Sequence, residues 1–192
     1  MRNRNYYIIN SLTFYRLLSA PVLVALSIAN QLYIFRWLLA FSFFTDLIDG
    51  ALARHFKVTS VLGSRVDSVA DDLTVAAGIT GLYMFKPDFM KENAVIILVL
   101  IGLFVFQTVT ALIKYRRTTS FHTYLAKIAA IFQGVFLILT FFSEDSLYWL
   151  FYPAVAITAL DLTEEIVLVL MLREWQPDVG GIFPVLKKRK KL

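Results

Sequence analysis

Cysteine is absent from the 192-residue chain, and histidine is nearly absent, because only His55 and His122 are present. Without cysteine the chain forms neither a disulfide nor a thiolate metal site. Two histidines also do not supply the ligand set of a histidine-built zinc centre. A metal bound by this chain would therefore be held through oxygen atoms, the ligands that hard ions such as Mg²⁺ and Mn²⁺ prefer.

Charged residues are also scarce. They make up 17% of the sequence, and hydrophobic residues make up 58%, whereas a soluble domain carries about 25% charged residues. This composition leaves too little polar surface to cover a water-soluble globule. We therefore expect an integral membrane protein, and its length suits a single domain over residues 1–192.

Long apolar segments recur along the chain. A membrane-spanning helix needs about 20 mostly apolar residues, and six segments meet this requirement: residues 11–29, 32–53, 60–85, 93–114, 123–142 and 147–172. We expect an all-α integral membrane fold with six transmembrane helices. No small-x-small cleavage site follows the first segment, so we interpret it as a retained span.

The residues before the first span, 1–10, contain two Arg and two Tyr. This mixture favours an interfacial segment that lies on the membrane surface. A simple aromatic and basic anchor is an equally open alternative.

The basic residues fall on one side of this six-span layout. They are Arg2, Arg4, Arg54, His55, Lys57, Arg65, Lys114, Arg116, Arg117, Arg173 and the run at 187–191. The positive-inside rule places this side, with both termini, in the cytoplasm of a bacterial-type inner membrane.

Residues 173–192 form a basic cytoplasmic tail. In a soluble protein such a run would suggest nucleic-acid binding. Beside a membrane domain we expect anionic membrane lipids as its partner, at about 1 kcal/mol per basic residue, and no nucleic acid. A role in fixing topology alone fits the tail equally well.

Aspartates interrupt the apolar sequence of the second and third expected spans, at Asp46, Asp49, Asp67, Asp71 and Asp72. A carboxylate at membrane depth costs about 2.5–3.5 kcal/mol on insertion scales. Asp46 and Asp49 are three residues apart and share a helix face, and Asp67 and Asp71, four apart, share another. Because these two spans run antiparallel through a short loop, carboxylates of both can meet.

Converging carboxylates repel one another, and divalent cations relieve this repulsion. Four acids around two ions about 4 Å apart form an arrangement that holds a pyrophosphate and neutralises its leaving group. Arg54 offers a fixed positive donor for phosphate oxygens. Gly50, Ala53 and Gly63 let a nucleotide or a neighbouring helix come close to the backbone. Helix packing by small residues and ion transport by intramembrane acids are the alternatives.

The pattern D-x2-D-G-x2-A-R-x8-G-x3-D-x3-D extends from residue 46 to residue 71. It resembles the signature of the CDP-alcohol phosphotransferase family at all eight fixed positions and all spacings. The resemblance implies a membrane enzyme that transfers a phosphoalcohol group from a CDP-linked donor to an acceptor hydroxyl and releases CMP. It further implies CDP-diacylglycerol as donor, a small polar alcohol as acceptor, two Mg²⁺ or Mn²⁺ ions, and a homodimer.

The resemblance also implies roles for the matching residues. Asp46, Asp49, Asp67 and Asp71 would bind metal, and Asp71 would also act as the general base on the acceptor hydroxyl. The CDP pocket would be formed by Gly50, Ala53, Gly63 and Arg54. A metal-bound carboxylate keeps a low proton affinity, so Asp71 acting mainly to orient the nucleophile is the alternative.

The acceptor site is less clearly marked. Lys127, Arg117 and His122 are cations near the cytoplasmic ends of the fourth and fifth spans, where an acceptor phosphate would be favoured. Positive-inside topology and a snorkelling lysine explain the same residues. The segment LAKIAAIFQ resembles phosphatidylglycerophosphate synthases, but the fourth span lacks their Arg- and Glu-bearing signature. Glycerol 3-phosphate, serine and an inositol phosphate all stay open as acceptors.

Three further acids, Asp161, Glu164 and Glu165, lie in the sixth expected span. We expect Asp161 and Glu165 to form ion pairs with Lys127 or Arg16, since buried charges are normally paired. Binding of an acceptor amine is the alternative. A divalent-cation or proton-coupled transporter is the second function class, but the repeats and broken helices typical of such proteins are not evident.

Overall fold

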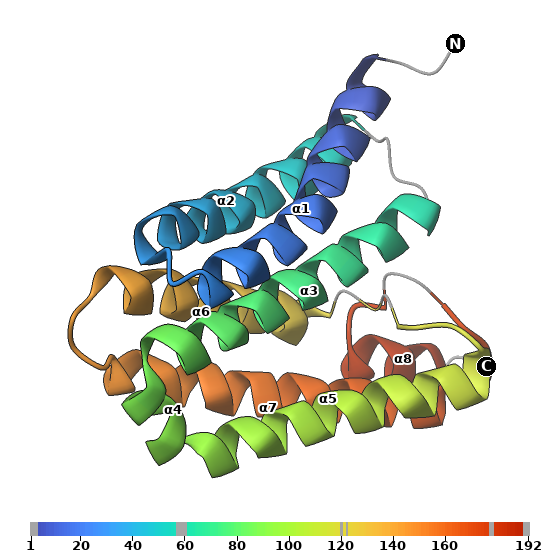
Figure 1. Ribbon diagram of the computed structural model, residues 1–192. Coiled ribbons are helices and arrows are strands. Elements are labelled where there is room, and N and C mark those ends of the chain that lie inside the picture. The colour runs from blue at the N-terminus through green and yellow to red at the C-terminus, as the bar shows by residue number, and fades with distance from the viewer. Residues whose placement is uncertain (1–3, 57–60, 120, 122, 177–178, 190–192) are drawn as a thin grey trace. The chain divides into compact units, whose positions relative to one another are not determined.

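A computed structural model describes residues 4–56, 61–119, 121, 123–176 and 179–189. For helical residues 4–10, 12–13, 49–56, 61–65 and 188–189 it describes only the backbone. The elements are α1 (Arg4–Ile28), α2 (Leu32–Phe56), α3 (Val61–Phe85), α4 (Pro87–Glu92), α5 (Ala94–Tyr115), α6 (Tyr124–Phe142), α7 (Tyr148–Met171) and α8 (Ile182–Arg189) (Figure 1).

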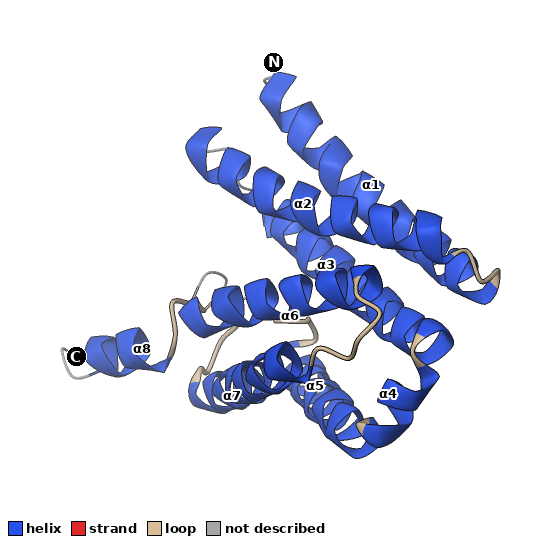
Figure 2. Ribbon diagram, turned by 90° about the vertical axis from the view of Figure 1, so that its left-hand side faces the viewer, coloured by secondary structure: helices blue, strands red, loops and turns tan. Residues whose placement is uncertain are grey.

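The described part of the chain is all-helical and contains no strand (Figure 2). This confirms the all-α prediction, and each expected span coincides with a helix of 19 to 25 residues. The short helices α4 and α8 were not predicted. α1 runs unbroken from Arg4, so a separate interfacial segment at 1–10 stays a prediction.

Two helices, α5 and α6, are long and apolar enough to cross a membrane, and Phe14–Ile28 of α1 is a shorter apolar stretch. The acids within α3 and α7, three in each, make those helices less apolar. The six-span layout and the cytoplasmic placement of the termini therefore stay predictions.

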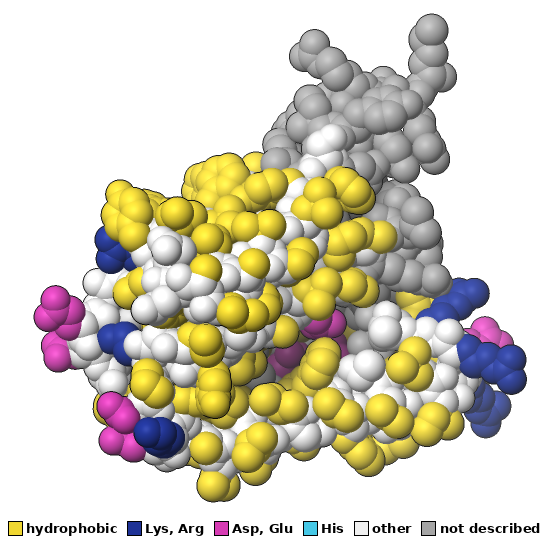
Figure 3. Space-filling view, viewed as in Figure 1, with side chains coloured by type: hydrophobic (Ala, Val, Ile, Leu, Met, Phe, Trp, Pro, Cys, Tyr) yellow, Lys and Arg dark blue, Asp and Glu magenta, His cyan; other side chains and the backbone are white. Residues whose placement is uncertain are grey.

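Large hydrophobic side chains are widely exposed, as expected of a protein that faces lipid. On α5 they include Val95, Leu98, Val99, Phe106 and Ile113. Hydrophobic side chains cover much of the face seen in Figure 3, and Lys and Arg gather at its edges.

The chain divides into two compact units. The first holds residues 1–91 and 137–146, and its α1 packs along α2 and α3 (Figures 1 and 2). Small buried side chains, such as Ala20 of α1 and Ala70 of α3, let the helix backbones approach closely. The hydroxyls of Ser19 and Ser42 lie 3.0 Å apart and join α1 to α2.

A tight turn connects α1 to α2. Asn30 takes the left-handed conformation, with φ of 54°. Its N–H donates to the Ser27 carbonyl at 3.1 Å, and the Gln31 N–H donates to the Leu26 carbonyl at 2.9 Å. This is the hydrogen-bond pattern of a Schellman motif, which ends a helix and satisfies its last carbonyls. The turn sends α2 back along α1, towards the residues of the acid motif.

An aromatic cluster lies at the end of the first unit that is away from the acid motif. The ring centres of Phe35 and Phe141 are 4.9 Å apart, and those of Phe35 and Phe85 are 5.2 Å apart. Gly81 lies against this cluster, because a Cβ placed on it would be 2.4 Å from Phe35 Cζ. Phe35 is completely buried and has little room to move.

We expect Gly81→Ala to lower the thermal unfolding temperature of the detergent-solubilised protein. Overpacking of a filled core costs about 1–3 kcal/mol, which outweighs a helix-propensity gain of about 1 kcal/mol. Gly102→Ala is the matched control, since no atom lies within 4 Å of its added Cβ. Equal unfolding temperatures for the two variants would contradict this packing.

The second unit holds residues 92–136 and 147–192, with α5 packed on α7. At the end of α7 the side chains of α5 satisfy its last carbonyls. Lys114 Nζ donates to the carbonyls of Val169 and Leu170, at 2.8 and 3.0 Å. The Tyr115 hydroxyl oxygen lies within hydrogen-bonding distance of both the Val169 and the Leu172 carbonyl, at 2.9 and 2.8 Å. Val185 of α8 is buried in a hydrophobic cluster that also contains Leu168 and Val169 of α7, so the predicted tail includes a packed helix.

Candidate active site

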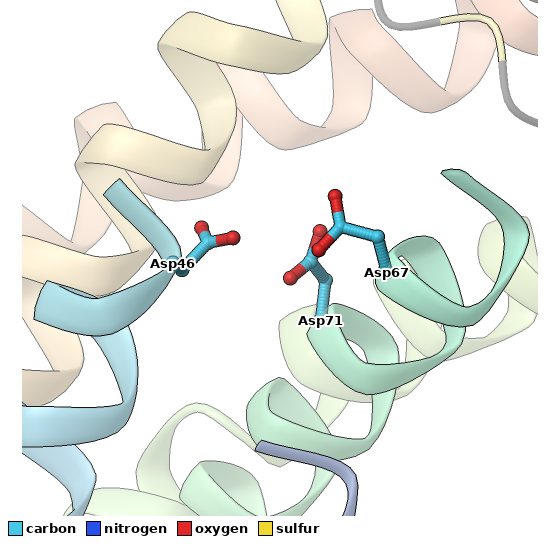
Figure 4. Close-up of side chains that lie close together, drawn as sticks. All are labelled: Asp46, Asp67 and Asp71. Carbon is cyan, nitrogen blue, oxygen red and sulfur yellow. The ribbon is translucent and has the colours of Figure 1, made fainter. Parts of the chain in front are cut away.

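Three carboxylates meet in the first unit. Asp46 extends from α2, and Asp67 and Asp71 extend from successive turns of α3. One oxygen of each lies within 4.8 Å of one oxygen of each other. Figure 4 shows the Asp46 carboxylate facing the pair on α3. The sequence-based expectation that acids of these two helices meet is therefore confirmed for these three residues, which we call the acid cluster.

Arg16 of α1 joins the acid cluster. Its side chain is 1% exposed, and Nη1 lies 2.6 Å from Asp46 Oδ1 and 2.9 Å from Asp67 Oδ1. Nη2 forms an ion pair with Asp71. One guanidinium therefore contacts all three carboxylates, and α1 is bound through it to both α2 and α3.

Arg16 was expected, as an alternative to Lys127, to pair with Asp161 and Glu165 of the sixth span. Its described ion pairs are with Asp46, Asp67 and Asp71. A signal was available, because Arg16 is the one charged residue between residues 11 and 29. A lone arginine at membrane depth requires an acidic partner. The aspartates of residues 46–71 are the most numerous group of acids in the expected spans.

The acid cluster fits a divalent cation. Its donors are all carboxylate oxygens, which suit Mg²⁺ or Mn²⁺. Arg16 balances only one of the three negative charges, so ionised carboxylates retain an excess of negative charge at short range. The three carboxylate side chains are half-buried, so they stay partly accessible.

The other motif residues lie on the same two helices, but their side chains are outside the described part of the chain. Asp49, Gly50, Ala53 and Arg54 are on α2, and Gly63 is on α3. Asp49 follows Asp46 by three residues, and helical periodicity therefore puts it on the face that carries Asp46. Its metal-binding role, and the nucleotide-binding roles of the other residues, stay predictions.

The expected acceptor residues belong to the second unit. Lys127 is exposed on α6, and its Nζ lies 5.4 Å from the centre of the Tyr124 ring. Arg117 stacks on Trp175, with Cζ 5.7 Å from the ring centre. Trp175 in turn donates to the Thr118 carbonyl. His122 lies outside the described residues, and none of the three is shown to bind an acceptor.

The acids of α7 accept hydrogen bonds from neutral donors. Glu165 Oε2 accepts from Gln107 Nε2 at 2.7 Å, and Glu164 Oε1 accepts from the Ile182 N–H at 3.0 Å. Asp161 Oδ1 accepts from the Thr123 hydroxyl at 3.4 Å. Such bonds help to satisfy the acceptor oxygens of these half-buried carboxylates. The Glu164 bond also fixes the start of α8, beside Gly181 with its φ of 128°.

Comparison with known proteins agrees with the site. A family model for CDP-alcohol phosphatidyltransferase matches residues 6–163, which include the whole acid motif and Arg16. The chain belongs to this family. The reaction class of the family is transfer of a phosphatidyl group from a CDP-alcohol, and its enzymes are generally dependent on divalent metals.

The cardiolipin synthase (CMP-forming) / mitochondrial hydrolase fusion protein of Schizosaccharomyces pombe is 38% identical to the chain over 71 residues. That region is 37% of this chain and 12% of the relative. No solved structure matches the chain.

Proposed function

We propose that the protein transfers the phosphatidyl group of CDP-diacylglycerol to the hydroxyl of a small polar alcohol and releases CMP. The observation that carries the proposal is the acid cluster, formed by motif aspartates of two helices within a chain of the CDP-alcohol phosphatidyltransferase family. If these aspartates lay on helix faces that do not meet, a role in helix packing would be favoured over a role in catalysis.

The acceptor oxygen attacks the phosphorus that bears diacylglycerol. The bond from that phosphorus to the bridging oxygen of CMP breaks, and CMP leaves. Asp71 takes the hydroxyl proton or orients the hydroxyl for attack. Asp46, Asp49 and Asp67 would hold the divalent cations together with Asp71. Two such ions, when bound, would stabilise the negative charge that develops on the leaving CMP.

The remaining motif residues bind the donor in this proposal. Gly50, Ala53 and Gly63 have little or no side chain, so the cytidine part of the donor can lie close to the helix backbones. Arg54 donates hydrogen bonds to phosphate oxygens. These roles follow from the match to the family motif.

The proposal places the enzyme in the membrane as one domain over residues 1–192, with six spans and the acid cluster near the cytoplasmic side. A homodimer is part of the proposal by resemblance to the family. The basic tail, residues 173–192, contacts anionic lipid headgroups.

The acceptor is the open part of the proposal. The partial relative is a CMP-forming cardiolipin synthase, and cardiolipin carries two phosphatidyl groups on one glycerol. This adds phosphatidylglycerol to glycerol 3-phosphate, serine and inositol phosphate as a candidate. Lys127, Arg117 and His122 are the proposed contacts for an acceptor phosphate.

The test is CMP release by purified protein in nanodiscs containing CDP-diacylglycerol and Mn²⁺, with each candidate acceptor added separately. We expect release that depends on one acceptor, with a new phospholipid detected by mass spectrometry. Absence of release with every acceptor, together with metal-ion flux in vesicles, would favour the transporter alternative instead.

A further inference from the structure

The position of Arg16 suggests a role that the motif does not describe. Three of its features matter: the side chain is 1% exposed, it lies on α1 rather than on the motif helices, and it contacts all three carboxylates of the acid cluster. Asp46 and Asp67 both contact the same nitrogen, Nη1, at 2.6 and 2.9 Å. The guanidinium therefore occupies oxygens that a divalent cation would also need.

We propose that Arg16 is a built-in counter-cation that holds the acid cluster together without metal, competes with metal for its oxygens and so sets its metal affinity. This inference rests on the proposed function, because it assumes that the acid cluster binds metal. It assigns to Arg16 a positioning role, through the carboxylates, and no contact with substrate.

Two physical properties support competition. First, arginine stays protonated at any accessible pH, so it does not leave the site by losing its charge. Second, like charges at contact distance in a half-buried site repel strongly. A metal ion that binds these oxygens must therefore displace the guanidinium or share carboxylates with it, and either event weakens binding.

The same contacts stabilise the metal-free protein. Without Arg16, the three carboxylates on two helices would lose the one guanidinium that contacts all of them. Such a cluster would push α2 and α3 apart or take up protons. Loss of the arginine charge should therefore lower stability in chelator and raise the stabilisation that metal provides.

The experiment measures Mn²⁺ binding to the full-length protein in detergent by electron paramagnetic resonance of the free ion. Arg16→Gln should bind Mn²⁺ at least about tenfold more tightly than wild type, because one competing charge at contact range is removed. Arg16→Lys keeps the charge but lacks the planar fork, and we expect affinity between those of wild type and Arg16→Gln.

Arg36→Gln is the matched control. Arg36 lies on α2 in the same unit, and its guanidinium lies 5.0 Å from the ring centres of Tyr33 and Phe142. Its removal should leave Mn²⁺ affinity at the wild-type value.

A second readout is the thermal shift caused by Mn²⁺, which grows with affinity. It should be larger for Arg16→Gln than for wild type, and the unfolding temperature in chelator should be lower. If Arg16→Gln does not fold, the same two measurements on Arg16→Lys test the inference. Unchanged or weaker Mn²⁺ binding by a folded Arg16 variant would overturn the inference. Absence of Mn²⁺ binding by wild type would overturn the proposed metal site itself.

Discussion

Asp71→Asn is expected to lower CMP release by about 10²–10⁴-fold, the range typical for loss of a general base. The substitution keeps the size of the side chain but removes a negative charge from the acid cluster and the group that would accept the acceptor proton. The measurement is the initial rate of CMP release at saturating CDP-diacylglycerol and acceptor.

Asp72→Asn is the matched control for this prediction. Asp72 is the next residue on α3, but successive helical residues are rotated by about 100°, and Asp72 is not among the three acids that meet. It should retain close to wild-type activity. Equal loss in both variants would mean that charge on α3 in general, rather than the acid cluster, is what activity requires.

Chelation is expected to have an effect of similar size. EDTA followed by dialysis should reduce CMP release to background, and Mg²⁺ or Mn²⁺ should restore it, because the negative charge of the acid cluster exceeds that of Arg16. Loss of one metal-binding carboxylate should lower the rate of CMP release at least about 100-fold. Loss of a residue that only hydrogen-bonds to a metal ligand already lowers metal affinity or activity by about 10–100-fold. The measurement is activity against free metal concentration, for wild type and Asp67→Asn.

Asp67→Asn should need a higher metal concentration for half-maximal activity than wild type. Activity that persists after exhaustive removal of metal would contradict the role assigned to the acid cluster. Asp72→Asn again serves as the control, with an unchanged metal requirement.

The helices and the acid cluster could be predicted because both depend on local sequence. Long apolar runs specify helices, and residues three or four apart fall on one helix face. Asp67 and Asp71 therefore share a face whatever surrounds them. Because only a few residues separate α2 from α3, the two helices are expected to lie side by side. Asp46 is then expected near Asp67 and Asp71.

Arg16 could not be placed in the same way. It lies 30 residues before Asp46 in the sequence, and periodicity says nothing about which distant acid an arginine meets. The acids of α7 also lie in apolar sequence, so the need for an acidic partner did not by itself decide between the two groups of acids. Packing of α1 against α2 and α3 decides the pairing, and packing is a tertiary property.

The hydrogen-bond donors to the α7 acids and the presence of helix α8 were not predicted. A cation was expected beside Asp161 and Glu165, and their described contacts include hydrogen bonds from the neutral side chains of Thr123 and Gln107. Pro184 lies in the first turn of α8. Proline is tolerated in the first turn of a helix, where its missing N–H would have no partner, and Val185 is buried in the hydrophobic cluster of the second unit.

The most direct test of the central claim follows the phosphorus atom itself. CDP-diacylglycerol labelled with ³²P at the phosphate that bears diacylglycerol would be incubated with the purified protein, Mn²⁺ and the acceptor. We predict that the label moves into a new phospholipid while unlabelled CMP forms in equal amount, and that Asp71→Asn stops both. Label recovered only in unreacted CDP-diacylglycerol, or released into water-soluble products, would contradict phosphatidyl transfer by this protein.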